Sequence, residues 1–124
     1  MFIPKSLHYT KNHLWLMRIG SDHFFVGITD FAQKQIGTVH RAHLKLESQT
    51  IKKDTAWGKI NGTEQSLDLV LPFDCEVINT NTNLDHSSLN TKPYEQWFLR
   101  VSKPNIPDYM FLTNHDYKEF CMDS

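Results

Sequence analysis

Short apolar segments that recur about every ten residues are the feature that most constrains the fold of this chain. The segments are rich in aromatic and β-branched residues and are bounded by turn-forming residues, which is typical of β-strands. They span residues 14–19, 23–28, 39–46, 68–72, 75–80 and 97–101. Many short strands at this spacing predict an all-β barrel or sandwich.

Two short helices are predicted between and after these strands. A helix is predicted over residues 29–37, because Asp30 can cap its start, Gln33 can complete a capping box and Gly37 suits its end. A second helix is predicted over residues 114–121, with Asn114 or Asp116 as its cap. The side chains expected to face the core are Phe31, Ala32 and Ile36 in the first helix, and Tyr117, Phe120 and Cys121 in the second.

The Asn61-Gly62 pair predicts a β-hairpin. Asn-Gly is the strongest short-range hairpin signal, because both residues tolerate the positive φ of a type I′ turn. Strand-like residues flank the pair at 57–60 and at 66–71. We therefore expect the tip of a hairpin at residues 61–64, with Asn61, Gly62 and Thr63 in the turn.

Charge and hydropathy exclude several classes of protein. The 124 residues include 13 Lys+Arg and 14 Asp+Glu, so the formal net charge is −1. This balance lacks the basic surface that binds nucleic acid or an anionic membrane. No apolar run approaches the roughly 20 residues of a transmembrane helix, and no secretory signal is recognised. We expect one domain over residues 1–124, monomeric and cytoplasmic.

Histidines and cysteines offer metal ligands, but their spacing does not bring them together. His40 and His43 are three residues apart, and a regular strand would place them on opposite faces. A zinc site needs three or four convergent ligands, so we expect no metal site. The two cysteines, Cys75 and Cys121, belong to no metal-binding pattern and are expected to be free thiols in a reducing compartment.

Several motifs resemble the H-protein of the glycine cleavage system. Residues 9–15 are similar to the family pattern YTxxHxW, and residues 26–33 read VGITDFAQ, as in the family. Similar segments follow at 72–77, at 93–97 and at 117–120, so the resemblance spans the chain. It implies a mainly β, lipoyl-domain-like barrel-sandwich hybrid with small added helices.

The resemblance also implies a family chemistry. H-proteins carry a lipoyl group amide-linked to one lysine at a hairpin tip. This arm takes an aminomethyl group from glycine decarboxylase, presents it to the aminomethyltransferase and is reoxidised by dihydrolipoyl dehydrogenase. Because such proteins are carriers, we expect that this chain is not an enzyme and has no catalytic residue.

The position that resembles the lipoyl-lysine is Glu64. The family's tip motif GxVESVK resembles the seven residues that begin at Gly58, which puts its final lysine at Glu64. In the family a proline follows the lysine by eight residues, and Pro72 follows Glu64 by eight here. The matches before and after the tip therefore give the same alignment without a gap. Two further family positions, implied to guide the lipoylating enzyme, are Asn61 and Cys75 here. A carboxylate cannot form the amide, so no lipoyl cofactor is expected.

Three functions stay open at this point. The first is a non-carrier binding or regulatory module of glycine cleavage or lipoate-dependent pathways, with glycine decarboxylase, aminomethyltransferase or lipoylation enzymes as protein partners. The second is a diverged adaptor that uses the lipoyl-like fold for unrelated protein partners. The third is an aminomethyl carrier with an unforeseen modification.

Overall fold

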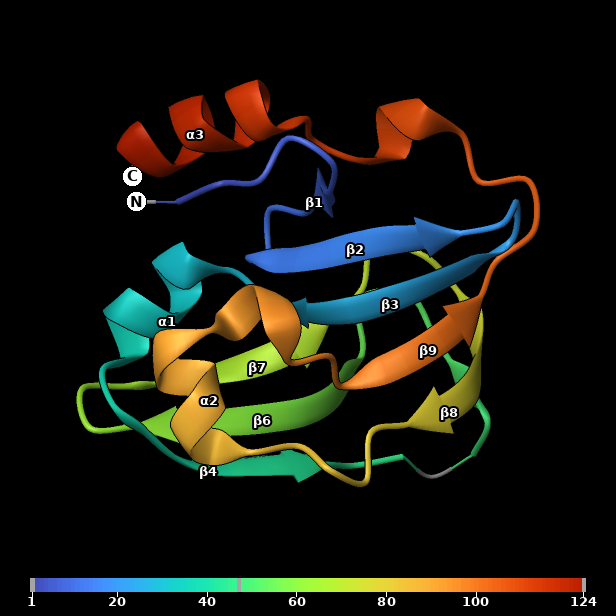
Figure 1. Ribbon diagram of the computed structural model, residues 1–124. Coiled ribbons are helices and arrows are strands. Elements are labelled where there is room, and N and C mark those ends of the chain that lie inside the picture. The colour runs from blue at the N-terminus through green and yellow to red at the C-terminus, as the bar shows by residue number, and fades with distance from the viewer. Residues whose placement is uncertain (1, 47, 124) are drawn as a thin grey trace.

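Two antiparallel sheets form the body of the molecule (Figure 1). The computed structural model describes residues 2–46 and 48–123. The larger sheet contains, in spatial order, β1 (His8–Tyr9), β2 (Leu14–Ile19), β3 (His23–Ile28), β9 (Leu99–Ser102), β8 (Cys75–Thr80) and β5 (Thr50–Ile51). The smaller sheet contains β4 (Val39–Leu44), β6 (Ala56–Gly62) and β7 (Ser66–Val70), with β6 in the middle.

The predicted strands are confirmed. The segments 14–19, 23–28 and 75–80 match β2, β3 and β8 residue for residue, and the other three match β4, β7 and β9 to within two residues at each end. The strands β1, β5 and β6 complete the two sheets. The expectation of a mainly β fold with small helices therefore holds.

One apolar core fills the space between the two sheets. Alternate residues of each strand point into it, as the two-residue period of a strand requires. The side chains with no exposed surface include Leu14, Leu16, Phe24, Val26, Ile28, Ile60, Leu69, Leu71, Phe98, Leu99 and Val101. Because these residues come from both sheets, the core holds the sheets in one fixed arrangement.

Helix α1 (Asp30–Ile36) follows β3 directly. Its N-cap is Thr29, whose Oγ1 accepts a hydrogen bond from the Ala32 N–H over 3.1 Å. The prediction that Asp30 is the cap is wrong by one residue, because the extended backbone that a cap requires is at Thr29. The predicted end at Gly37 is confirmed by its φ of 83°. The Gln33 amide donates to the Gly37 carbonyl instead of reaching back to the cap.

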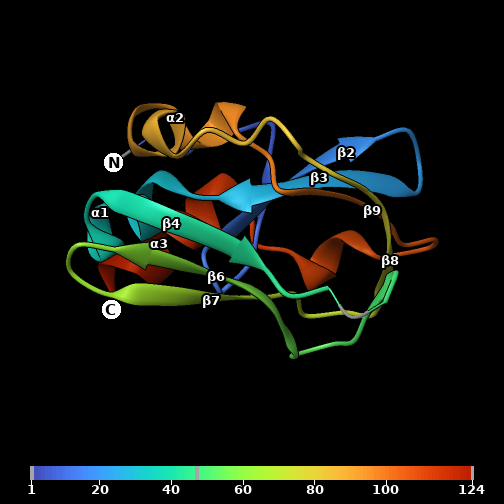
Figure 2. The same ribbon diagram turned by 90° about the horizontal axis from the view of Figure 1, so that it is seen from below.

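Helix α2 (His86–Thr91) was not predicted from the sequence. It packs on β4 (Figure 2). Asp85 caps it, and Leu89 is its one fully buried residue. With a single buried residue, the helix has no apolar period that could predict it. Its Asn90 side chain accepts from the Val39 N–H over 2.7 Å and donates to the Val39 carbonyl over 3.3 Å, as a neighbouring strand would.

Helix α3 (Asn114–Met122) covers a second, smaller apolar cluster beside β1. Its cap is Thr113, which accepts from the Asp116 N–H, so neither predicted cap was correct. The buried residues of this cluster are Leu7, Tyr9, Trp15, Tyr117 and Cys121. Cys75 lies in the main core, whereas Cys121 lies in this smaller cluster. Both thiols are free, as expected. Two 3-10 turns, η1 (Pro93–Glu95) and η2 (Asp108–Met110), complete the described elements.

Candidate functional site

The turn between β6 and β7 is the segment that the family resemblance assigns to function. The Gly62 N–H donates to the Gln65 carbonyl over 3.0 Å, so Thr63 and Glu64 are the two central residues of the turn. The predicted hairpin is confirmed, but its turn is not at Asn-Gly, because Asn61 and Gly62 are the last two residues of β6. Neither of them has a positive φ, so they do not form a type I′ turn.

Gly62 is required by a close approach to helix α1. A Cβ atom at this position would lie 2.1 Å from the carbonyl oxygen of Ile36, well inside the contact distance of any carbon and oxygen. Gly37 makes a similar approach from the other side, since its Cβ would lie 2.4 Å from Thr63 Oγ1. The two glycines therefore allow the turn to lie directly against the end of the helix.

A set of hydrogen bonds, which we call the turn–helix contact, fastens the turn to the C-terminal end of α1. The Ile36 carbonyl accepts from the N–H groups of Glu64 (2.9 Å) and Gln65 (3.3 Å). The contact satisfies a carbonyl that the helix end would leave without a partner. Its other bonds run from Thr63 N to the Thr38 carbonyl (3.0 Å), from Thr38 N to Thr63 Oγ1 (3.1 Å) and from the Gln65 amide to the Gln35 carbonyl (2.9 Å).

The Glu64 side chain is exposed, although its backbone is fastened. Among the residues that the structure describes, Glu64 takes part in no ion pair. No residue from 61 to 65 carries a side-chain amine. The nearest lysine along the hairpin, Lys59, lies in mid-strand on β6, opposite His43 on one side and Asp68 on the other. The turn therefore presents a carboxylate to solvent, and no amine.

Cys75 is not part of this site. It begins β8, which lies in the other sheet at the opposite end of the molecule from the β6–β7 turn (Figures 1 and 2). It is 5% exposed, and burial raises its thiol pKa to about 12, with Asp74 adding to the rise and Lys103 opposing it. A buried thiol with a raised pKa is a weak nucleophile, so Cys75 is a core residue.

His13 joins the N-terminal segment to α1 and α3. It has a φ of 67°, and its Nδ1 lies 2.8 Å from Tyr117 Oη, which in turn lies 2.7 Å from Thr29 Oγ1. The ring packs on Phe31, with the centroids 4.8 Å apart. Burial lowers the pKa of His13, because the charged imidazolium loses hydration. This chain of contacts gives His13 a structural role.

A bulge changes the predicted geometry of the histidines on β4. His40 is an extra residue between Val39 and Arg41, so His40 and His43 are both exposed instead of lying on opposite faces. The ligand atoms of one other group, His115, Asp116 and Glu119, lie within 4.8 Å of one another among the described residues. All three side chains are exposed on α3, where water competes for any cation.

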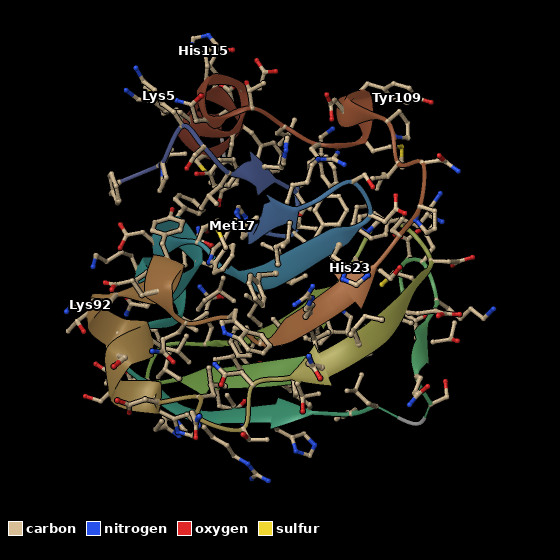
Figure 3. The ribbon with its side chains drawn as sticks, turned by 45° about the vertical axis from the view of Figure 1, so that its right-hand side comes forward. Lys5, Met17, His23, Lys92, Tyr109 and His115 are labelled. Atoms are coloured by element: carbon tan, nitrogen blue, oxygen red, sulfur yellow. The ribbon has the colours of Figure 1, made fainter. Side chains whose placement is uncertain are left out.

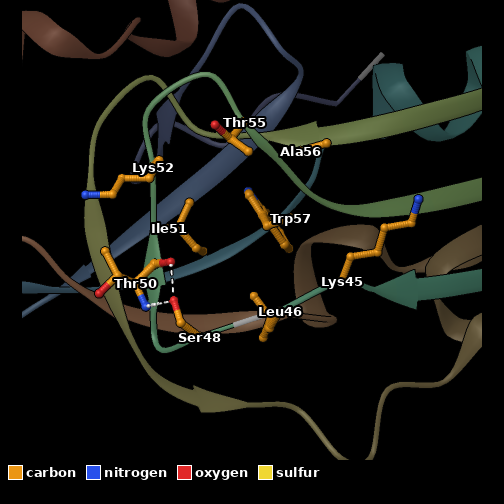
Figure 4. A pocket seen from close by; sticks show the side chains of 9 residues that line it. All are labelled: Lys45, Leu46, Ser48, Thr50, Ile51, Lys52, Thr55, Ala56 and Trp57. Carbon is orange, nitrogen blue, oxygen red and sulfur yellow. Dashed lines mark hydrogen bonds between the residues drawn. The ribbon is translucent and has the colours of Figure 1, made fainter.

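A shallow pocket of about 310 Å³ lies between residues 45, 46, 48 and 50–52 on one side and residues 55–57 on the other (Figure 4). Trp57 lines it and is 2% exposed, and its indole N–H has no hydrogen-bond partner among the residues that the structure describes. Figure 4 shows the ammonium groups of Lys45 and Lys52 on opposite sides of the pocket, pointing away from its centre. The pocket therefore offers no converging set of charged groups.

Comparison with known proteins assigns the chain. A family model described as the glycine cleavage H-protein matches residues 7–124. The chain belongs to the glycine cleavage H-protein family. The glycine cleavage system H protein of Anaeromyxobacter sp. (strain K) is 36% identical over 109 residues, covering 86% of this chain and 84% of the relative. That of Clostridioides difficile (strain 630) is 30% identical over 121 residues, covering 95% and 97%.

The fold of the H-protein family is confirmed by a solved structure. The crystal structure of a glycine cleavage system H protein from Mycobacterium marinum superposes with a TM-score of 0.78 at 24% identity, covering 98% of each chain. The lipoyl-domain-like fold expected from the sequence is therefore correct. Membership of a family of carrier proteins also agrees with the expectation that the chain is not an enzyme. No helix in the described residues is long and apolar enough to span a bilayer.

Proposed function

We propose that this H-protein family member is a non-carrier: it binds protein components of the glycine cleavage or lipoate-dependent pathways without bearing a lipoyl arm. The observation that carries the proposal is the exposed Glu64 carboxylate at the centre of the β6–β7 turn. The family's cofactor is attached at a hairpin tip, and this turn occupies the corresponding place in the register.

The residues of the turn do not fit a lipoyl group. Amide attachment requires a primary amine as the nucleophile, whereas Thr63, Glu64 and Gln65 offer a hydroxyl, a carboxylate and an amide. Lys59 does not replace the missing amine, because it is half-buried and points from the face of the smaller sheet. Lys34 does not replace the missing amine either, because it belongs to α1 and not to the turn. Its ammonium group lies 3.5 Å from the Asp30 carboxylate.

A fastened turn is suited to recognition. The turn–helix contact fixes the backbone on both sides of Glu64, so a partner that touches the turn does not have to order it first. The partners we propose are glycine decarboxylase and the aminomethyltransferase, whose surfaces accept the tip of an H-protein. The protein would compete with a lipoylated H-protein for them, in the reducing cytoplasm where both thiols stay free.

The proposal is tested by competition in a reconstituted glycine cleavage reaction. Lipoylated H-protein, glycine decarboxylase, aminomethyltransferase and dihydrolipoyl dehydrogenase are supplied at fixed concentrations, and this protein is titrated in. We expect inhibition that excess lipoylated H-protein reverses, and weaker inhibition by Glu64→Lys with its side chain left unmodified. No binding and no inhibition at high excess would reject the proposal in favour of unrelated partners.

Intact mass spectrometry tests the remaining alternative. Protein purified from its native source is expected to have the mass of the unmodified chain. An adduct, located by peptide mapping, would instead identify a carrier with a modification outside the family pattern.

A further inference from the structure

The outer face of the larger sheet carries an apolar surface that the turn does not involve. We call it the outer-sheet patch and define it by Met17, Phe25, Ile78, Trp97 and Arg100. Met17 and Ile78 are 40% and 44% exposed, and the other three are half-buried. Figure 3 shows Met17 and His23 on this face, pointing out from the sheet.

Strand register brings the patch together. Met17 on β2 pairs with Phe25 on β3, Phe25 pairs with Arg100 on β9, and directly paired residues share a face. The Trp97 ring packs on Phe25 with the centroids 4.8 Å apart. Ile78 is the extra residue of a bulge in β8. The bulge turns Ile78 outward, whereas the preceding residue, Val77, packs on the core.

Arg100 is a positioned cation without a counterion. Its guanidinium lies 5.8 Å from the centroid of the Phe25 ring, and its Nε donates to His23 Nδ1 over 3.1 Å. It forms no ion pair among the described residues, although Glu76 lies on the next outward row of the same sheet, opposite Ser102. The terminal nitrogens of the guanidinium are therefore oriented and available.

We propose that the outer-sheet patch docks a protein partner that presents a carboxylate within an apolar surface. Aromatic residues, Met and Arg are the side chains enriched at the centres of protein interfaces. The flat guanidinium can bind a carboxylate through two parallel hydrogen bonds, and the apolar rim excludes water from that pair. Because Phe25 and His23 already hold Arg100, little side-chain freedom is lost on docking.

This inference rests on the proposed function, because it takes the partner to be glycine decarboxylase or the aminomethyltransferase. The purified enzymes are the probes, and Kd is measured by calorimetry at two salt concentrations. We expect Arg100→Glu to weaken the binding by about tenfold or more, with Arg100→Lys intermediate. Lys118→Glu makes the same charge change on the exposed side of α3 and is expected to change Kd by less than about twofold.

The outcomes separate the two proposals. If the wild type binds and Arg100→Glu and Lys118→Glu weaken the binding equally, the inference that the outer-sheet patch is the docking surface is overturned. The proposed function would still stand. No binding by the wild type would overturn both. Sedimentation that shows a dimer of this chain broken by Arg100→Glu would assign the patch to a second copy, which also overturns the inference. If Arg100→Glu does not fold, Met17→Asp replaces it, because Met17 is exposed and its substitution opposes a carboxylate in the same way.

Discussion

Replacing Gly62 with alanine should detach the hairpin turn from helix α1. The new Cβ would lie 2.1 Å from the Ile36 carbonyl oxygen and 2.7 Å from its carbonyl carbon. Both are backbone atoms, so no side-chain rotation can relieve the overlap. The turn must move away, and the bonds from the N–H groups of Glu64 and Gln65 to that carbonyl are then lost.

The magnitude follows from the bonds that break. Each hydrogen bond contributes about 0.5–1.5 kcal/mol net, and the turn–helix contact has five of them, of which the two to the Ile36 carbonyl are lost first. A loss of about 1–3 kcal/mol is expected for these two bonds, together with a fall in Tm of about 4–12 °C for a chain of this length. Thermal unfolding measures the first quantity, and hydrogen exchange at Glu64 and Gln65 measures the detachment itself.

Gly20→Ala is the matched control. Unlike Gly62, Gly20 has a positive φ, 65°, but a Cβ there meets nothing within 4 Å. Only the left-handed conformation opposes the alanine, at a cost of about 1–2 kcal/mol, and exchange at the turn should not change. If Gly62→Ala keeps the wild-type Tm and the protection of both amides, the turn–helix contact does not hold the turn.

Three other predictions follow from the same structure. Burial lowers the pKa of His13 below 6.5, so the unfolded state takes up its proton first, and the free energy of unfolding should fall as the pH drops from about 7 to 5. His13→Asn, which tolerates the positive φ, should flatten that slope in urea titrations. Asn90→Ala leaves the buried Val39 N–H without a partner and should cost about 1–3 kcal/mol in chemical denaturation, while Asn90→Asp keeps the acceptor and should cost less. Glu64→Lys should be lipoylated poorly by a lipoate ligase, as read by intact mass, and more efficiently with Asn61→Glu added; equal modification of both would show that Asn61 does not matter.

The sequence predicted the strands well because their signal is local. Aromatic and β-branched runs bounded by turn residues gave β2, β3 and β8 their correct bounds. The cap of each predicted helix was missed. The true caps, Thr29 and Thr113, each stand directly before a residue that is also a favourable cap, Asp30 or Asn114. Helix α2 was missed because it buries one side chain.

The sequence predicted the hairpin but not the geometry of its turn. Glu64 was located from the family register, and the structure places it at the centre of an exposed turn. Asn-Gly was interpreted as the turn itself, whereas Gly62 is needed for a contact with a helix that is distant in sequence. Cys75 was named from the family pattern as a position that guides lipoylation, and the strand that it begins belongs to the other sheet. Such contacts between segments depend on the fold, which spacing along the chain does not describe.

The Asn90 side chain also covers part of the free edge of the smaller sheet. Strand β4 is an edge strand, and the free N–H and C=O groups of an edge can template the addition of another chain. Asn90 forms hydrogen bonds with both the N–H and the C=O of Val39. Arg41, further along the strand, is exposed, and its charge would repel the Arg41 of a second copy that paired with this edge. A chain that loses this amide would therefore become more prone to aggregate at high concentration, even at temperatures where it stays folded.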